Sequence, residues 1–248
     1  MIIIKSAAEI DKMRRAGEVV ALAHEAVKQA VQPGVTTLEL DRIAAEVIKK
    51  KGGIPSFKGY GGYPANICTS VNEEVIHGIP SKRVLREGDI IGVDIGALLN
   101  GFHGDAAATH GVGKISDEAK RLIDTTKQAF YEGIAKAMPG NRVSDISVAV
   151  QRKAESAGFN VVREFVGHGV GHSLHESPEV PNYHTGRHGV RLQEGMTLAV
   201  EPMVNAGSYE ILKLSDDWTI VTADGLLSAH YEHSIAITKS GPILLTVL

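Results

Sequence analysis

An internal repeat constrains the fold of this chain more than any other feature of its sequence. The segments QPGVTTLELDRIAAEVIKKKGG (residues 32–53) and MPGNRVSDISVAVQRKAESAGF (residues 138–159) each contain Pro-Gly at the second and third positions, and in each a further glycine follows at the same separation. The apolar residues that recur in them at helical spacing are Leu40, Ala44 and Ile48, and Ile146, Val150 and Ala154. The pattern predicts two similar halves, each with a helix that follows Pro-Gly and ends at glycine.

A second pair of matching segments places an acid at the same point of each half. LREGDIIGVD ends on Asp94 and LQEGMTLAVE ends on Glu201, and in both a Leu-x-Glu-Gly segment precedes a run rich in strand-forming residues. Further upstream, His-Gly pairs at His77 and His168 extend the match. The repeat therefore carries acids and histidines in register, which a purely structural duplication does not require.

We expect one α+β domain over residues 1–248, with pseudo-symmetric halves at roughly 12–115 and 116–248 and no linker between them. The best helix candidates are residues 12–31, 37–51, 118–138 and 144–157.

Composition narrows the class of protein. With 248 residues, 43% hydrophobic and 22% charged, the chain is typical of an ordinary soluble domain. Its net charge of -3 gives no reason to expect a DNA-binding face. The single cysteine, Cys68, excludes an internal disulfide framework and fits a reducing cytoplasm. No apolar run approaches the roughly 20 residues of a membrane span, so we expect a cytoplasmic protein without a membrane partner.

The acid at Asp94 belongs to a predicted hairpin. Asn100-Gly101 is a strong signal for a two-residue turn between antiparallel strands. If the turn forms there, Asp105 lies diagonally from Asp94 on the same face of the ladder, at a Cα separation of roughly 7 to 8 Å. Two carboxylates so placed can converge on one cation.

The second half repeats these acids, because Glu201 matches Asp94 and Glu232 matches Asp105 with a longer insertion between them. Solvated strand acids are the alternative, but the flanking residues are apolar or small. Four buried carboxylates cannot all stay ionised without cations, so two divalent ions are expected. With an added imidazole the donor set suits manganese, iron or cobalt, with zinc possible. Two such ions can activate a shared water, which indicates hydrolysis.

The motifs around these residues resemble one family over essentially the whole chain. HGIP, VDIGA with GFHGDAA, GHGVGHSLHE, EPMV and YEHSIAIT occur in the order typical of type I methionine aminopeptidases of the bacterial kind. The resemblance implies the pita-bread fold, in which two α+β halves surround a dinuclear metal centre. It also implies removal of the initiator methionine from proteins whose second residue is small.

The same resemblance implies metal-binding roles, position by position. Asp94 would bind one metal, His168 and Glu201 the other, and Asp105 with Glu232 would bridge both. Glu201 would further act as general base toward the bridging water.

Substrate-binding roles are implied as well. His77 and His175 would contact the substrate, and His175 would stabilise the charge that develops on the carbonyl oxygen. The methionine pocket would be lined by Phe57, Tyr60, Tyr63, Cys68, Leu174 and Trp218. A further implication is a monovalent cation near Asn72 and Ser228. The implied partners are nascent polypeptide N-termini at the ribosome, and the implied oligomeric state is a monomer.

Two alternatives stay open. X-Pro-type aminopeptidases share the fold and all five ligand types, but usually carry a long N-terminal domain. A metal-free pita-bread protein that serves as a binding module would lack ligands, whereas all five are present here.

The remaining histidines are interpreted separately. His24 lies on an apolar stripe and is expected to be a hydrogen-bonded core residue, and His172 is not expected to be a ligand. His168 and His175 would lie on opposite faces of a straight strand, so a bend is expected near Gly171. The histidines expected around the site or at the surface are His103, His110, His184, His188, His230 and His233.

Overall fold

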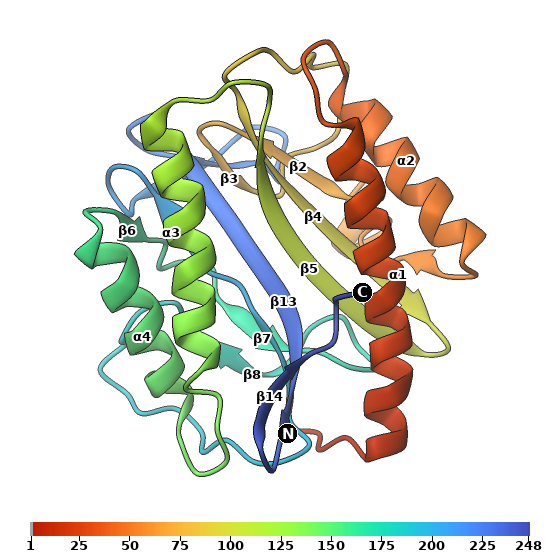
Figure 1. Cartoon of the computed structure of the whole chain (residues 1–248), viewed down its shortest axis with the longest axis vertical. Helices are drawn as coiled ribbons and strands as arrows, with labels where there is room; N and C mark the ends of the chain where they lie inside the picture. The colour runs from red at the N-terminus through yellow and green to blue at the C-terminus, as the bar shows by residue number, and fades with distance from the viewer. Residues whose placement is uncertain (1) are drawn as a thin grey trace.

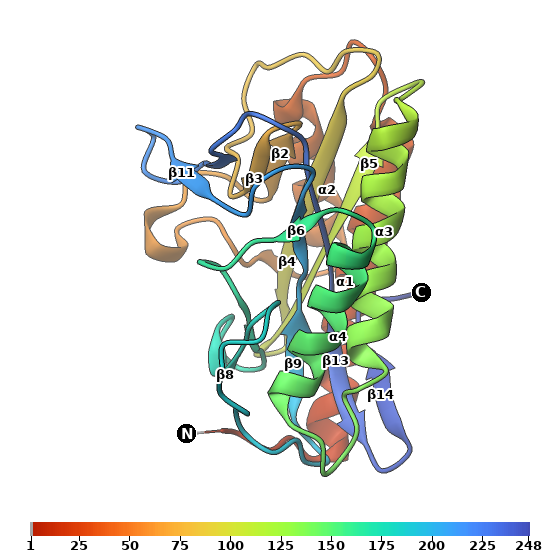
Figure 2. The same cartoon turned by 90° about the vertical axis from the view of Figure 1, so that its left-hand side faces the viewer.

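Two pairs of helices cover one face of a large sheet in the computed structural model, which describes residues 2–248 (Figures 1 and 2). The helices are α1 (Ala7–Ala30), α2 (Thr37–Lys50), α3 (Asp117–Ile134) and α4 (Val143–Ser156). All four predicted helices are confirmed, although α1 begins before residue 12 and α3 ends at Ile134 rather than at residue 138. Its start is set by a capping box in which the Ser6 hydroxyl accepts from the Glu9 amide and the Glu9 carboxylate accepts from the Ser6 amide.

Among the described residues, eleven strands form the main sheet and three form a smaller one. The central path of the main sheet runs β1 (Ile54–Pro55), β4 (Ile90–Leu99), β5 (Phe102–Gly111), β13 (Ser228–Thr238), β9 (Thr197–Val200), β7 (Gly167–Gly169) and β8 (Glu176–Val180). Attached to it are β2 (Cys68–Val71), β6 (Asn160–Val161), β10 (Met203–Asn205) and β14 (Gly241–Leu244). The smaller sheet contains β3 (Glu74–Ile76), β11 (Ile211–Lys213) and β12 (Ile220–Thr222). The two halves meet where β5 pairs with β13.

The predicted hairpin of the first half is confirmed as β4 and β5. Asn100 and Gly101 form its turn with φ of 51° and 80°, the left-handed values that a two-residue turn of this kind needs. Asp94 pairs with Ala107 and Asp105 with Gly96, so the two acids lie diagonally on one face, as expected.

The second hairpin has a different register at its acids. Val200 pairs with His233 and Met203 with His230, which places Glu201 directly opposite Glu232. The insertion between these strands contains β11 and β12, and β12 pairs with β3 of the first half. The extra residues of the second half therefore add a small sheet that contacts the first half.

Strand pairing contradicts the predicted repeat at two points. Ala107 stands opposite Asp94 as Glu232 stands opposite Glu201, so the predicted match of Glu232 with Asp105 is wrong in register. His168 on β7 pairs with Ala199, and Ser70 on β2 pairs with Gly92. Gly92 lies two residues before Asp94, and Ala199 lies two residues before Glu201. Their strand partners are therefore equivalent, which makes Ser70 the counterpart of His168. The predicted correspondence between His168 and His77 is wrong, because the local likeness of two His-Gly pairs is weaker than strand register as a sign of equivalence.

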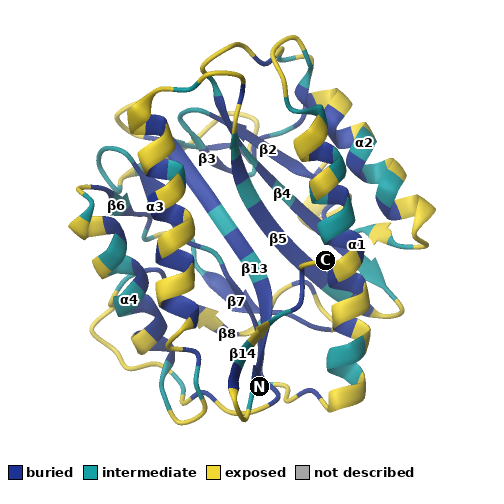
Figure 3. Ribbon diagram, viewed as in Figure 1, coloured by how far each residue is buried: buried dark blue, intermediate teal, exposed yellow. Residues whose placement is uncertain are grey.

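Each half has its own hydrophobic core between its helices and the sheet (Figure 3). The apolar stripes of α2 and α4 are confirmed, since the six residues that define them are fully buried. His24 is confirmed as a hydrogen-bonded core residue, with Nε2 2.8 Å from the Ala106 carbonyl oxygen. No helix within residues 2–248 combines the length and apolar character needed to cross a bilayer.

Candidate active site

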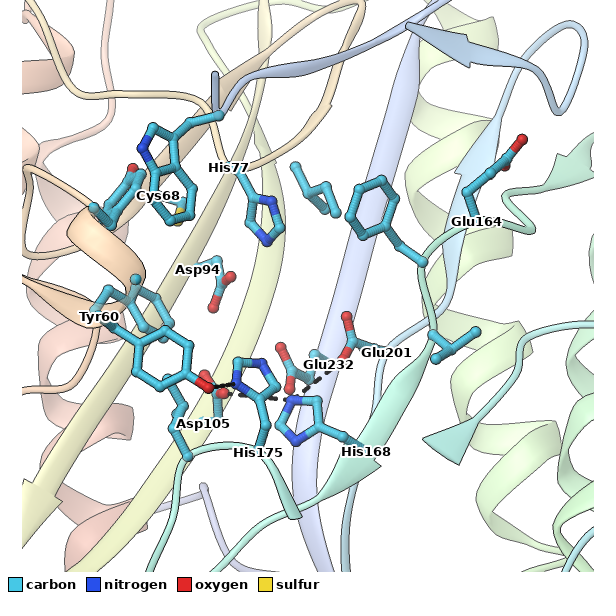
Figure 4. A pocket seen from close by; sticks show the side chains of 18 residues that line it. Tyr60, Cys68, His77, Asp94, Asp105, Glu164, His168, His175, Glu201 and Glu232 are labelled. Carbon is cyan, nitrogen blue, oxygen red and sulfur yellow. Dashed lines mark hydrogen bonds and ion pairs between the residues drawn. The ribbon is translucent and has the colours of Figure 1, made fainter. Parts of the chain in front are cut away.

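A cavity of about 380 Å³ lies on the face of the sheet away from the helices (Figure 4). Every predicted metal, catalytic and pocket residue lines it: Phe57, Tyr60, Tyr63, Cys68, His77, Asp94, Asp105, His168, Leu174, His175, Glu201, Trp218 and Glu232. The structure thus brings together residues that are spread over both halves of the chain.

The four acids come from three neighbouring strands and the end of a fourth. Asp105 on β5 and Glu232 on β13 are 4% and 2% exposed, and with His168 they offer donor atoms that all lie within 4.8 Å of one another. His168 Nε2 is also 3.5 Å from a carboxylate oxygen of Glu201. Asp94 on β4 faces the same cavity. The strand pairings that hold these elements side by side therefore fix the spacing of the acids.

Several buried carboxylate oxygens of this cluster lack a hydrogen-bond partner among residues 2–248. Buried oxygens of Asp94, Asp105 and Glu232 have no hydrogen-bond partner in the described chain. Burial, reinforced by the neighbouring acids, raises the pKa of Asp105, Glu201 and Glu232 well above the usual range, and burial raises the pKa of Asp94 to about 7. Orphaned carboxylate oxygens beside an imidazole fit a divalent metal, because cations would offset both the missing hydrogen bonds and the mutual repulsion.

His168 is prepared to act as a neutral nitrogen ligand. Its Nδ1 is 2.8 Å from the Gly169 carbonyl oxygen, which can only accept, so the proton resides on Nδ1. Nε2 is then left with a free lone pair directed at the acids. Burial lowers the pKa of His168 to about 4, which keeps the ring uncharged at neutral pH.

Two further histidines flank the acids. His175 packs beside His168 with ring centroids 4.2 Å apart and planes tilted by 56°, and its Nδ1 is 2.7 Å from the Tyr60 hydroxyl. His77 has a φ of 59° and packs its ring edge-to-face against Phe165 at 5.5 Å. Burial lowers the pKa of His77 to about 4. Both histidines are therefore held at the cavity by contacts other than the acids.

The apolar end of the cavity is a compact cluster of Phe57, Tyr63, Cys68 and Leu174, with Trp218 packed against it. The Phe57 ring lies so close to Gly96 that a Cβ there would be 2.6 Å from the ring, so glycine is required at that position. Tyr60 borders the cavity from the outside and is 46% exposed. Sequence reasoning missed the lining residues Gly61, Ile76, Glu164, Phe165 and Val166. Glu164, Phe165 and Val166 immediately precede β7, so their position next to the Gly-His motif could have identified them as lining residues.

Asn72 and Ser228 lie together, because the Ser228 amide donates to the Asn72 carbonyl oxygen at 2.9 Å. The Asn72 side chain donates to Asp89 and accepts from the Ile90 amide, while the Ser228 hydroxyl donates to Asn205. The monovalent cation expected here stays a prediction.

The expected bend near Gly171 is confirmed as a complete reversal of the chain. Gly169 on β7 pairs with Glu176 on β8, so the segment between them forms the tip of a hairpin that carries His175. His172 points away from the acids: its Nδ1 donates to the Gly101 carbonyl oxygen at 2.9 Å and its ring stacks on Phe102. His172 thus fastens the hairpin tip to the β4–β5 turn.

A buried ion pair fastens the same tip to the N-terminal segment. Lys5 Nζ donates to the Glu176 carboxylate, and the two side chains are 2% and 5% exposed. The other Glu176 oxygen accepts from the Ser173 amide at 3.2 Å, and the Lys5 amide donates to the Gly195 carbonyl oxygen. Residue 5 therefore helps to hold the segment that carries His175.

Replacing Lys5 by methionine is expected to lower the free energy of unfolding by about 3 to 5 kcal/mol, because Glu176 is left buried without its partner. Denaturant titration monitored by circular dichroism measures this change. The double variant Lys5→Met/Glu176→Met is expected to recover most of it. Lys213→Met, which removes an exposed ion pair with Asp217, is the control and should leave stability essentially unchanged. A Lys5→Met protein as stable as the parent would contradict this account.

The fold and the buried acid–histidine cluster together define a class of enzyme: the chain belongs to metallopeptidase family M24, whose model matches residues 11–239. Within that family the chain is similar to methionine aminopeptidases. It is 57% identical to the methionine aminopeptidase of Clostridium acetobutylicum over 100% of this chain and 99% of that protein. Methionine aminopeptidase 1 of Bacillus subtilis is 55% identical over 99% of each chain.

Solved structures agree with these similarities. The crystal structure of methionine aminopeptidase from Thermotoga maritima superposes with a TM-score of 0.98 at 47% identity and covers 100% of both chains. Prolidase from Pyrococcus furiosus shares the fold alone, with a TM-score of 0.80 at 23% identity over 99% of this chain and 66% of that one. The resemblance to bacterial methionine aminopeptidases and the pita-bread fold that the motifs predict are both confirmed.

Proposed function

We propose that this enzyme removes the N-terminal methionine from polypeptides whose second residue is small. The observation that carries the proposal is the position of the apolar cluster, which adjoins the buried acids within one cavity of about 380 Å³. A thioether side chain in the apolar part would bring the first peptide bond close to the acids. The names of the relatives at 57% and 55% identity support the same reaction.

Five side chains would hold two divalent ions in this proposal. Asp94 would bind one, His168 and Glu201 the other, and Asp105 with Glu232 both; manganese, iron or cobalt suit this donor set, and zinc is possible. When bound, such ions polarise a peptide carbonyl and lower the pKa of water enough to supply a nucleophile at neutral pH.

The other steps belong to the protein's own groups. Glu201 accepts the proton that the attacking water loses and returns it to the departing amine. The Tyr60 hydroxyl lies 2.7 Å from Nδ1 of His175; in the tautomer in which it donates there, Nε2–H of that ring would donate to the carbonyl oxygen as its charge develops. His77, held against Phe165, contacts the substrate backbone from the other side of the acids.

The apolar cluster would select methionine by shape and polarisability. Phe57, Tyr63 and Trp218 offer aromatic surfaces, and Cys68 offers a small thiol wall. Burial raises the pKa of the Cys68 thiol, which keeps it protonated and a weak nucleophile. An unbranched thioether fills such an irregular apolar space well.

Nascent polypeptide N-termini presented at the ribosome are the proposed substrates, and the cytoplasm is the proposed site of action, with the protein acting as a monomer. A buried free cysteine fits a reducing compartment. The monovalent cation near Asn72 and Ser228 belongs to this proposal as well.

Incubation of the cobalt- or manganese-reconstituted protein with Met-Ala-Ser and with X-Pro peptides tests the reaction. Free methionine is expected from Met-Ala-Ser, and none after exhaustive chelation, with recovery when metal is restored. Mass spectrometry of the products distinguishes the two peptide classes. Release of the residue that precedes proline, without release of methionine, would refute the proposal.

A further inference from the structure

His230 is a buried histidine beside the acids to which the proposed reaction gives no task. It lies on β13 two residues before Glu232, so both side chains point to the same face of the sheet. The side chain is 4% exposed, and Nε2 has no hydrogen-bond partner in the described chain. This nitrogen is 3.8 Å from a carboxylate oxygen of Glu201 and 3.9 Å from one of Glu232.

The fold itself does not use this ring nitrogen. The His230 amide donates to the Thr109 hydroxyl, which donates in turn to the His230 carbonyl oxygen, each at 2.9 Å. His230 therefore contributes only its main-chain atoms to this contact between β13 and β5. His24 on α1 and His233 on β13 differ, because each engages a ring nitrogen with another part of the fold. An unpaired buried N–H is costly, so an interaction with the adjacent acids is the best explanation for its presence.

Strand register gives His230 a counterpart in the first half. Asp94 and Glu201 end the matching segments, and in the second hairpin Glu232 stands opposite Glu201. In the first hairpin Asp105 lies two residues nearer the turn than Ala107, the residue opposite Asp94. In the second hairpin His230 lies two residues nearer the turn than Glu232, the residue opposite Glu201. His230 therefore holds the ladder position from which Asp105 reaches the centre.

We propose that His230 is a positioning residue of the metal centre: its neutral ring donates Nε2–H to the Glu201 and Glu232 carboxylates and so orients their remaining oxygens toward the cations. A neutral imidazole carries one N–H, and on Nε2 this group faces the two carboxylates. The present separations exceed a hydrogen bond by roughly 1 Å. Rotation about the broad terminal torsion of a glutamate changes such a distance at little cost.

This inference rests on the proposed function, because it requires that Glu201 and Glu232 bind metal. Hydrogen bonds to ligating carboxylates typically contribute about 10- to 100-fold to metal affinity. Removal of the donor is therefore expected to weaken cobalt binding rather than to abolish it.

Calorimetric titration of the metal-free protein with Co²⁺ tests the proposal directly. His230→Leu is expected to bind Co²⁺ about tenfold or more weakly, whereas His230→Gln, whose amide can donate, stays within about threefold of the parent. His230→Met is a second apolar variant in case the leucine side chain prevents folding. His110→Leu is the matched control, since His110 also has an unpartnered Nε2 but lies on the opposite face of the sheet; its affinity should not change.

The visible absorption of bound Co²⁺ separates a donor from a ligand. A spectrum of His230→Gln that matches the parent supports the positioning role. Equal losses of affinity in the leucine and glutamine variants, with altered spectra in both, would make the ring a direct ligand and overturn it. Parent-like affinity in the leucine and methionine variants would overturn it as well. If the parent protein itself bound no Co²⁺, the proposed function would fail instead.

Discussion

Replacing Asp105 by alanine is expected to abolish methionine release while leaving the fold in place. Asp105 is 4% exposed and shares a donor cluster with His168 and Glu232, so in the proposed centre it would contact both cations. Loss of a bridging ligand removes several kcal/mol of transition-state stabilisation, which corresponds to a decrease in kcat/KM of about 10³-fold or more. Steady-state release of methionine from Met-Ala-Ser measures it.

The control for this variant separates lost chemistry from lost structure. His110→Ala lies on the same strand, β5, but its side chain faces away from the cavity. That variant should retain activity, and circular dichroism should show native secondary structure in both proteins. Near-parental turnover by Asp105→Ala would refute the shared-metal arrangement.

Asp105→Asn is expected to be more stable than the parent without metal and less stable than the parent when metal is added. Burial raises the pKa of Asp105 well above its usual range, so the folded protein binds the proton more tightly than the unfolded chain does. The stability that this group contributes is then present below the unfolded pKa of about 4 and is lost as pH rises toward the folded pKa. At pH 8 without metal, asparagine avoids this cost and should be more stable by at least about 1 kcal/mol, the free energy of one pKa unit.

Added Co²⁺ should invert that difference. A ligand present at a hundredfold excess over its Kd stabilises the folded protein by about 2.7 kcal/mol, and the parent should gain more than the variant, which lacks one carboxylate. Thermal unfolding at pH 8 and pH 4, with and without Co²⁺, measures all four differences. At pH 4 without metal the two proteins should converge. A metal-free variant less stable than the parent at pH 8 would contradict the assignment of a destabilising buried carboxylate.

The sequence predicts the helices and the first hairpin well because their signals are local. The apolar stripe around Leu40 and its counterpart around Ile146 define helices directly, and Asn100-Gly101 fixes one register. The cavity residues could be named only because several short motifs occur together in family order. Periodicity alone does not bring Phe57 close to Leu174, since that contact depends on how separate strands pair.

The parts that sequence reasoning missed are those set by long-range pairing. The repeat suggested that His168 corresponds to His77, yet the pairing of β7 with β9 makes Ser70 the counterpart. The role of His172 as an anchor for the hairpin tip depends on Gly101 in the other half. Neither contact leaves a periodic trace in the sequence, because each joins segments that are far apart along the chain.

The pairing of β5 with β13 in the middle of the sheet also sets an order of assembly during synthesis. Asp94 and Asp105 leave the ribosome with the first half, whereas Glu201 and Glu232 follow much later on β9 and β13. Until β13 docks, Asp105 lies on β5, whose outer edge is open, and water can solvate this acid and the neighbouring Asp94. Closure of the sheet both completes the donor set and removes that water. The four acids therefore come together only when the two halves have joined.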